Sequence, residues 1–151
     1  MTLRPATAAD IPAIFAIRTA VRENAMTMAA LTANGVTPEA VAGMLATTAA
    51  GWIAGAGEGF AIADAEDGNL FALFVHPDHE GRGLGRALLR LAESWLASQG
   101  WQEAWLFTGA DRRLRAQGFY RAHGWHPSGW APAGEERLVR TLTNFPVTPK
   151  T

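Results

Sequence analysis

The most informative stretch of this chain is Val75-His76-Pro77-Asp78-His79-Glu80-Gly81-Arg82-Gly83-Leu84-Gly85-Arg86-Ala87-Leu88-Leu89. An apolar run ends there in a proline-containing turn, and a loop of glycines and arginines then opens directly into an amphipathic helix. Glycine allows backbone N–H groups to approach a ligand closely. The first turn of a helix adds unpaired N–H donors and a partial positive charge. The stretch therefore predicts a strand, a loop and a helix that together hold a phosphate chain.

The segments on either side of this loop support the prediction. Residues 70–75 are nearly all apolar, which is typical of a strand buried on both faces. After the loop, apolar side chains recur at helical spacing until Gly100, a residue that commonly ends a helix. These side chains are Leu84, Leu88, Leu91, Trp95 and Leu96.

The rest of the chain predicts strands and helices in alternation. Short apolar runs bounded by turn residues are interpreted as strands, and apolar residues at 3.6-residue spacing as helices. Residues 23–36 show neither pattern and are interpreted as irregular. The resulting order favours an α/β fold with a mixed sheet in three layers. Further strands are expected at 2–6, 51–55, 60–63, 101–108, from 125 and at 136–142, and further helices at 11–22, from 37 and at 112–123.

Length, charge and composition limit the classes of protein that remain. The 151 residues predict one domain, over 1–145, followed by a loose tail over 146–151. The absence of cysteine excludes disulfides, cysteine-ligated zinc and a thiol nucleophile. A net charge of −1 argues against a general binder of nucleic acid or anionic membranes. Since neither a signal peptide nor a run long enough to cross a bilayer is found, we expect a cytoplasmic protein.

Other phosphate-binding loops fit the glycine spacing poorly. A dinucleotide-binding loop has Gly-x-Gly-x-x-Gly, whereas this chain has Gly81-x-Gly83-x-Gly85. A Walker loop continues with Lys and then Ser or Thr, whereas Arg86-Ala87 follows here. A tight turn without any ligand remains an alternative on spacing alone.

Two stretches together resemble the GNAT superfamily of N-acetyltransferases. Residues 75–89 resemble its acetyl-CoA pyrophosphate loop, Gln/Arg-x-x-Gly-x-Gly/Ala, with Gly83 and Gly85 at the glycine positions. Residues 116–125 resemble its Ala-x-x-Phe-Tyr-x-x-x-Gly-Phe segment. Glu80 departs from the pattern at the Gln/Arg position, and Arg113 replaces an asparagine that often contacts the cofactor. The resemblance implies a GNAT-like, mostly antiparallel sheet with flanking helices and transfer of an acetyl group from acetyl-CoA to an amine.

The resemblance also implies which residues contact acetyl-CoA. Backbone groups of Leu73, Phe74 and Val75 would pair with the pantetheine arm in the manner of an added strand, and the Leu73 N–H would polarise the thioester carbonyl. The loop would hold the pyrophosphate, with positive charge from its two arginines. Its residues are Gly81, Arg82, Gly83, Leu84, Gly85 and Arg86.

Tyr120 and Glu23 are the candidate catalytic residues. Tyr120 lies at the family's general-acid position, where a phenol can donate a proton to the leaving thiolate; a packed helix tyrosine is the structural alternative. Asn69 aligns with a glutamate that serves as base in some members, and an amide cannot do so. Glu23 is favoured as base because the loop after the first helix borders the acceptor in this family. The other carboxylates considered are Glu58, Asp64, Glu66 and Asp67.

Other polar clusters receive structural interpretations. The pairs His76/His79 and His123/His126 have no accompanying carboxylate cluster, so no metal is expected. The arginines at 112, 113 and 115 are interpreted as a solvated face, with a contact to the 3′-phosphate of CoA as the alternative.

We expect a small-molecule amine as acceptor, no nucleic acid or membrane partner, and leave a homodimer open. Two alternatives remain: a non-catalytic acyl-CoA-binding or regulatory module, and an acetyltransferase for protein N-termini or lysines. The retained Tyr120 argues against the first of these. The charge pattern shows no acidic groove for a basic peptide, which argues against the second.

Overall fold

The computed structural model describes residues 2–142, which form one seven-stranded sheet in the order β1-β2-β3-β4-β5-β7-β6. The expected tail over 146–151 lies outside the described residues. The strands are β1 Leu3–Pro5, β2 Ala49–Ala54, β3 Gly59–Asp64, β4 Asn69–Val75, β5 Glu103–Thr108, β6 His126–Trp130 and β7 Glu136–Thr141. The helices are α1 Ile11–Ala20, α2 Met28–Ala33, α3 Pro38–Thr47, α4 Leu84–Ser98 and α5 Arg115–Ala122, with short 3₁₀ turns η1 Ala8–Asp10 and η2 Pro77–His79.

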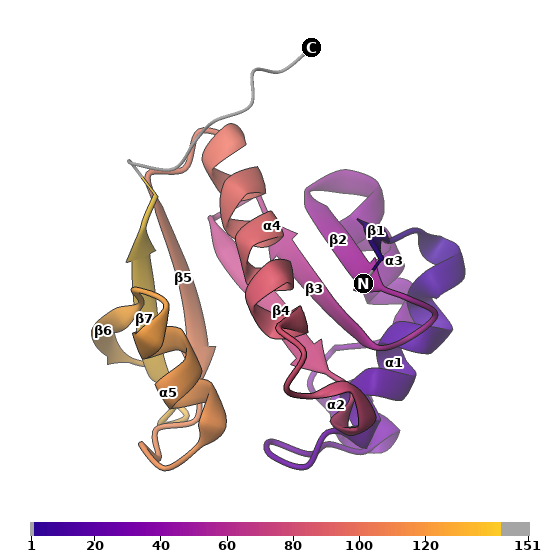
Figure 1. Ribbon diagram of the computed structural model, residues 1–151, viewed down its shortest axis with the longest axis horizontal. Coiled ribbons are helices and arrows are strands. Elements are labelled where there is room, and N and C mark those ends of the chain that lie inside the picture. Colours follow the sequence, from indigo (N-terminus) through magenta and orange to yellow (C-terminus); the bar gives the residue numbers. More distant parts are fainter. Residues whose placement is uncertain (1, 143–151) are drawn as a thin grey trace.

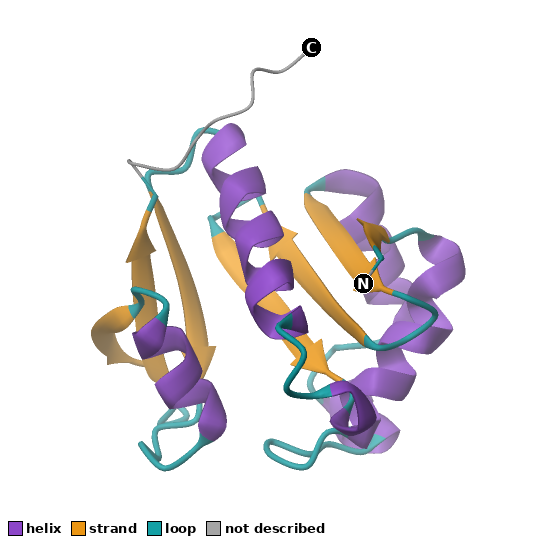
Figure 2. Ribbon diagram, in the orientation of Figure 1, coloured by secondary structure: helices purple, strands orange, loops and turns teal. Residues whose placement is uncertain are grey.

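The sheet is mixed and mostly antiparallel, as expected. Neighbouring strands of the sheet are antiparallel except β4 and β5, which run parallel because the crossover through α4 joins them. Figure 1 shows α4 and α5 in front of the strands, with α1 and α3 beside β1 and β2. Figure 2 shows the resulting layers of helix, sheet and helix.

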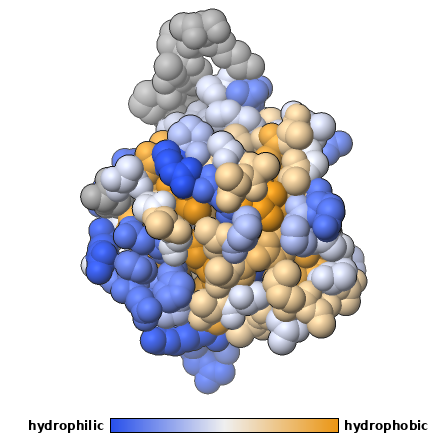
Figure 3. Space-filling model, turned by 90° about the vertical axis from the view of Figure 1, so that its right-hand side faces the viewer, coloured by the Kyte–Doolittle hydropathy of each residue, from blue (hydrophilic) through white to orange (hydrophobic). Residues whose placement is uncertain are grey.

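Two apolar clusters, one on each face of the sheet, form the core. One lies under α4, whose Leu88, Leu89, Ala92 and Leu96 are almost completely buried. The other joins α1 and α3 to β2, β3 and β4 and includes Ile17, Val41, Ile53 and Phe60. Figure 3 views the molecule from the side of α1 and α3, where apolar side chains show between hydrophilic ones. The two clusters confirm that helices cover both faces of the central strands.

The interpretation of residues 23–36 as irregular was wrong, because they contain the short helix α2. The Thr27 hydroxyl accepts a hydrogen bond from the Ala30 N–H at 3.1 Å, which caps the first turn. Only Leu31 of this helix is buried. A helix with one buried side chain leaves no apolar periodicity in the sequence.

The expectation that β4 is buried on both faces was also wrong for its second half. Ile62 pairs with Ala72 and Ala63 with Leu70, so Phe71 is an extra residue, a β-bulge. Phe71 is 37% exposed, and Leu73, Phe74 and Val75 are only partly buried. The reason is that β5 pairs with the first residue of β4 and then diverges from it.

Among residues 2–142, no helix combines the length and apolar character needed to cross a membrane.

Candidate active site

The site begins where β4 and β5 separate. Their ladder contains a single register pair, Asn69 opposite Trp105. The side-chain amide of Asn69 donates to the Trp105 carbonyl at 3.1 Å, and the Trp105 backbone N–H donates to the Gly68 carbonyl at 3.1 Å. These bonds hold the two strands together at one end. The gap that widens from there between β4 and β5 is called the wedge. Beyond these bonds, no strand within residues 2–142 pairs with the edge of β4 that faces away from β3. The backbone groups of this edge are therefore available to another extended chain.

A cavity of about 550 Å³ occupies this wedge. Its walls come from both separated strands, the loop after α1, the glycine loop and the start of α5. This size is within the range of pockets that hold small molecules. The lining residues are Val21, Arg22, Glu23, Asn24, Leu70, Phe71, Ala72, Leu73, Phe74, Val75, His79, Glu80, Gly81, Gly83, Leu84, Gly85, Arg86, Leu106, Phe107, Thr108, Gly109, Leu114, Arg115, Ala116, Phe119 and Tyr120.

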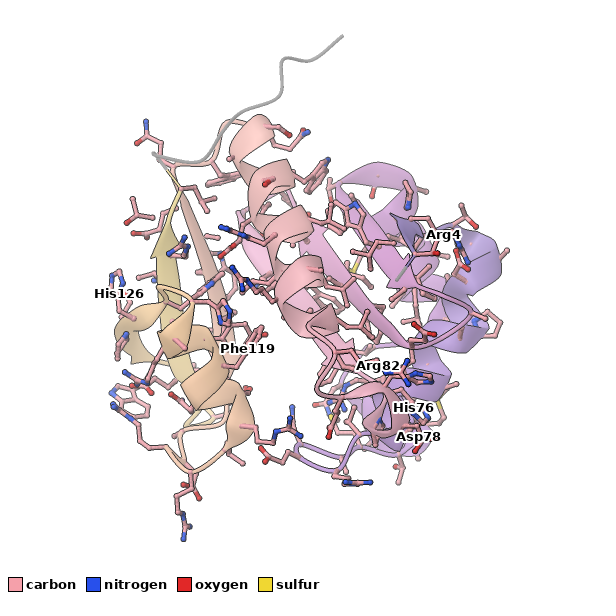
Figure 4. The ribbon with its side chains drawn as sticks, in the orientation of Figure 1. Arg4, His76, Asp78, Arg82, Phe119 and His126 are labelled. Atoms are coloured by element: carbon pink, nitrogen blue, oxygen red, sulfur yellow. The ribbon has the colours of Figure 1, made fainter. Side chains whose placement is uncertain are left out.

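The glycine loop leads into α4 through a left-handed backbone. Gly81 and Gly83 have φ values of +77° and +79°, a region that L side chains rarely adopt. Gly83 is the N-cap of α4, and no side chain of the described residues caps this helix end. The first N–H groups of α4 therefore point out of the helix with a partial positive charge. This donor set suits a phosphate, and Figure 4 shows Arg82 on the same loop, beside the turn that carries His76 and Asp78.

Gly85 differs from the other two glycines of the loop. It lies inside α4, and a Cβ built on it would be 3.5 Å from the ring of Phe119. That distance is ordinary van der Waals contact. Figure 4 shows Phe119 projecting from α5 toward α4. Gly85 thus lies where the two helices approach each other at the cavity.

An ion pair joins Glu80 to α5. The Oε2 atom of Glu80 lies 2.8 Å from Nη1 of Arg115, the first residue of α5. The neighbouring Arg113 pairs instead with Asp111 at 2.8 Å, in a more exposed position. Glu80, the residue that departs from the family pattern, therefore has an ion-pair partner on the opposite wall of the cavity.

Tyr120 lines the cavity from α5 while most of its ring is buried. Burial raises the pKa of the Tyr120 phenol above its usual value, and the negative charge of Glu93 raises it further. The phenol therefore stays protonated at neutral pH. Its ring packs edge-on against Phe119 and Trp125, with centroids 5.3 and 5.7 Å away.

A buried polar group on α4 supports this packing. The Glu93 carboxylate accepts a hydrogen bond from the Trp125 indole at 2.9 Å and pairs with Arg140 at 3.2 Å. Burial raises the pKa of Glu93, although Arg140 and the Trp125 hydrogen bond oppose that change. Glu93 thereby links α4, β7 and Trp125, which lies between α5 and β6.

Glu23 lies in the loop after α1, at the cavity. Its Oε2 accepts a hydrogen bond from the Arg115 backbone N–H at 2.8 Å. The N-cap position of α5 is Leu114, which has no polar side chain, so Glu23 caps this helix from 92 positions away in the chain. One carboxylate oxygen is engaged in this bond.

Arg18 fixes the loop that carries Glu23. Its guanidinium lies 4.4 Å from the centre of the Phe74 ring on β4 and donates to the Asn24 carbonyl at 2.9 Å. Burial lowers the pKa of Arg18, although it stays charged. Asn24 itself has a φ of +57°, so the loop turns sharply there.

A family comparison agrees with this geometry. Residues 17–125 match the acetyltransferase (GNAT) family. The chain belongs to the GNAT family. The matched range contains the glycine loop, both wedge strands and Tyr120, which are the parts that form the cavity.

Individual relatives of this GNAT chain cover it to different extents. It is 35% identical over 94 residues to a mycothiol acetyltransferase from Cellulomonas flavigena, which is 56% of this chain and 26% of that protein. The match thus spans about a quarter of the length of this curated relative.

Solved GNAT structures share the fold at low sequence identity. The PaiA N-acetyltransferase from Thermoplasma acidophilum, in complex with coenzyme A, superposes with a TM-score of 0.75 at 14% identity, covering 93% of this chain and 99% of that one. The ribosomal-protein-S18-alanine N-acetyltransferase from Escherichia coli has a TM-score of 0.70 at 18% identity, with 99% of both chains covered. The expected GNAT-like fold is confirmed.

The structure brings together most of the residues that the GNAT resemblance selected. Leu73, Phe74, Val75, Gly81, Gly83, Leu84, Gly85, Arg86, Tyr120 and Glu23 all line the cavity, and Arg82 lies within the same loop. Sequence reasoning missed Arg18, Phe71 and Phe107. An arginine on an otherwise apolar helix face was the available signal for Arg18.

The first histidine pair lies at the turn η2, just before the glycine loop. His79 lies 3.9 Å from Glu58, and His76 packs edge-on against His79. Over residues 2–142, no group of three or more His, Cys, Asp or Glu side chains could hold a metal ion.

Proposed function

We propose that this chain transfers an acetyl group from acetyl-CoA directly to a primary amine of a small molecule. The observation that carries the proposal is the cavity between β4 and β5. It joins a free strand edge, an uncapped helix N-terminus with nearby arginines, and a mostly buried tyrosine. A solved GNAT structure with bound coenzyme A supports the choice of donor.

The residues present fit acetyl-CoA. When bound, this cosubstrate supplies the thioester whose acetyl group is transferred. The edge of β4 at Leu73, Phe74 and Val75 would hold the pantetheine arm by backbone hydrogen bonds. The loop from Gly81 to Arg86 would hold the pyrophosphate through backbone N–H groups and its two guanidinium groups.

Tyr120 is the proposed general acid. A phenol carries its proton on Oη at neutral pH, and a thiolate leaving group needs a proton. Glu23 is the proposed base, either directly or through water, with the carboxylate oxygen that the Arg115 N–H does not occupy. Tyr120 and Glu23 line the same cavity, which is what acid and base need in order to act on one amine and one thioester.

The acceptor side of the cavity favours a small molecule over a basic peptide. Phe71, Phe107 and Arg22 line it, and Glu23, its one carboxylate besides Glu80, is hydrogen-bonded. The names of the relatives include both kinds of acceptor, since one is named for mycothiol and another for the alanine of a ribosomal protein. A protein N-terminus is therefore the second candidate acceptor.

The test is release of free CoA thiol from acetyl-CoA across a panel of small amines and peptides with free N-termini. The proposal expects amine-dependent release with small amines, and Tyr120→Phe is expected to reduce kcat about a hundredfold with acetyl-CoA affinity nearly unchanged. Release only with peptides would favour the second candidate. Binding of acetyl-CoA without release of CoA thiol for any amine would contradict the proposed enzymatic activity. An unchanged kcat in Tyr120→Phe would exclude Tyr120 as the general acid.

Glu23→Gln tests the base separately. Glutamine can still accept the Arg115 N–H bond, so the cap of α5 is retained while the basic group is lost. The expected result is loss of the limb of the pH–rate profile that reports a base. An intact profile would exclude Glu23 and direct attention to another carboxylate.

A further inference from the structure

Arg115 connects three segments at the mouth of the cavity. Its backbone N–H donates to Glu23, in the loop after α1, and its guanidinium pairs with Glu80, in the turn before the glycine loop. The distance is 2.8 Å in both contacts. All three residues line the cavity. The side chain of Arg115 therefore faces the loop that would receive the cofactor's phosphates.

The charges at this loop would allow the Arg115 guanidinium to exchange Glu80 for a phosphate. Glu80 is the one carboxylate among the residues that line the cavity along the loop, from His79 to Arg86. A carboxylate beside a pyrophosphate is repulsive, whereas a guanidinium beside it is attractive and can donate two parallel hydrogen bonds. The Arg115 side chain is 67% exposed, so its pair with Glu80 is the weak kind that another anion can displace.

We propose that Arg115 is a ligand of the cofactor's phosphate groups and that Glu80 competes with those phosphates for its guanidinium. The proposal rests on the proposed function, because it needs CoA at this loop. Glu80 then lowers the affinity for the cofactor, and Arg115 raises it. If the ion pair between Arg115 and Glu80 only stabilised the fold, both residues would instead raise the affinity for the cofactor.

Equilibrium binding to the purified chain, measured by titration calorimetry, separates these two roles. The ligands are CoA, 3′-dephospho-CoA and pantetheine, which carry progressively fewer phosphates. The variants are Arg115→Gln, Glu80→Gln and the double variant. Arg113→Gln is the matched control, because Arg113 lies two positions away and pairs with Asp111 rather than with the loop.

Arg115→Gln is expected to raise the Kd for CoA about tenfold and to leave the Kd for pantetheine unchanged. Glu80→Gln is expected to lower the Kd for CoA several-fold, and the double variant to resemble Arg115→Gln. If 3′-dephospho-CoA shows the same changes, Arg115 contacts the pyrophosphate; if it shows none, Arg115 contacts the 3′-phosphate. Arg113→Gln should match the wild type.

The proposal is overturned if Glu80→Gln weakens CoA binding as Arg115→Gln does, or if pantetheine binding falls in parallel with CoA binding. Opposite effects of the two substitutions cannot come from misfolding, since a damaged fold would weaken both variants. If the wild-type chain binds none of the three ligands, the proposed function fails as well. If the wild type binds CoA and Arg115→Gln binds it with the same Kd, only the role of Arg115 as a phosphate ligand is overturned.

Discussion

At Gly83, the conformation of the backbone decides which residue can be present. A Cβ there would meet nothing within 4 Å, so space is not the constraint. The φ of +79° is the constraint, because an L side chain in that region clashes with its own backbone. Gly85 has the helical backbone of α4 and room for a methyl group against Phe119.

Gly83→Ala is therefore expected to lower the free energy of unfolding by about 1–2 kcal/mol and to weaken CoA binding. Gly85→Ala, two positions away, is expected to cause no loss of stability, because the methyl group has room and alanine favours helix over glycine. Urea denaturation of both variants, with CoA titration, measures the two effects. Equal stability losses at the two positions would contradict the role assigned to φ.

Asp10 shows how one buried carboxylate ties β1 to α1. It accepts hydrogen bonds from both terminal nitrogens of Arg4, at 2.8 and 2.7 Å, and from the Thr7 N–H at 2.9 Å. The Arg4 hydrogen bonds, followed by that of Thr7, lower the pKa of Asp10 from 3.8 to about 2. Since the folded-state pKa lies below the unfolded one, this stabilisation is complete above pH 4 and disappears as the pH falls toward 2.

Asp10→Asn is expected to cost about 1 kcal/mol at pH 7, a modest value because Arg4 is half exposed and screened by solvent. Near pH 2 the variant and the wild type should differ much less. Urea denaturation at the two pH values measures this. Asp111→Asn is the control, since its exposed pair with Arg113 should contribute little; a loss for Asp10→Asn that is independent of pH would contradict the argument.

At the scale of elements, α5 is held to the sheet by Glu136, the first residue of β7. Its Oε1 accepts from Gln117 and from Arg121, each at 3.1 Å, and its Oε2 lies 3.5 Å from Arg112. Gln117 also donates to the Gly109 carbonyl at 2.7 Å. This buried network sets the position of the helix that carries Tyr120 and Arg115.

Glu136→Ala is expected to lower the free energy of unfolding by about 3 kcal/mol, because it leaves Arg121 and Gln117 with unsatisfied donors in a buried site. Arg112→Gln is the matched control and should change stability little, since that arginine is 62% exposed. Chemical denaturation measures both. If the two variants are equally stable, the network does not hold α5.

At the scale of the molecule, the cavity separates two parts of one sheet. β1 to β4 lie on one side, and β5, β7 and β6 on the other. The parts meet through the single β4–β5 register pair and beneath α4, whose side chains pack against both β4 and β5. A ligand that fills the wedge contacts both parts and is expected to stabilise the whole fold.

CoA at a hundred times its Kd is therefore expected to add about 2.7 kcal/mol and to raise Tm by roughly 5–10 °C. ATP and NAD should cause little change, because they have no pantetheine arm for the edge of β4. A thermal-shift series with these three ligands tests the prediction. Stabilisation by ATP or NAD without stabilisation by CoA would contradict the proposed donor.

Contacts between neighbouring residues could be predicted from the sequence. The glycine loop, the start of α4 and the Phe119-Tyr120 segment are local patterns, because positive φ, helix capping and apolar spacing depend on residues a few positions apart. The same reasoning failed for α2, which has one buried side chain, and for the second half of β4, where apolar residues line a cavity instead of a core.

Residue patterns predicted the order of the strands and of all the helices except α2, together with the glycine-rich loop that leads into α4. Three features became visible only in three dimensions: β5 leaves β4 after Asn69, Arg115 joins Glu23 and Glu80, and Arg18 lies on Phe74. The residues that make these contacts are far apart along the chain. An ion pair or a cap between residues 35 to 92 positions apart depends on how the sheet brings its strands together, and no local pattern of residues records that.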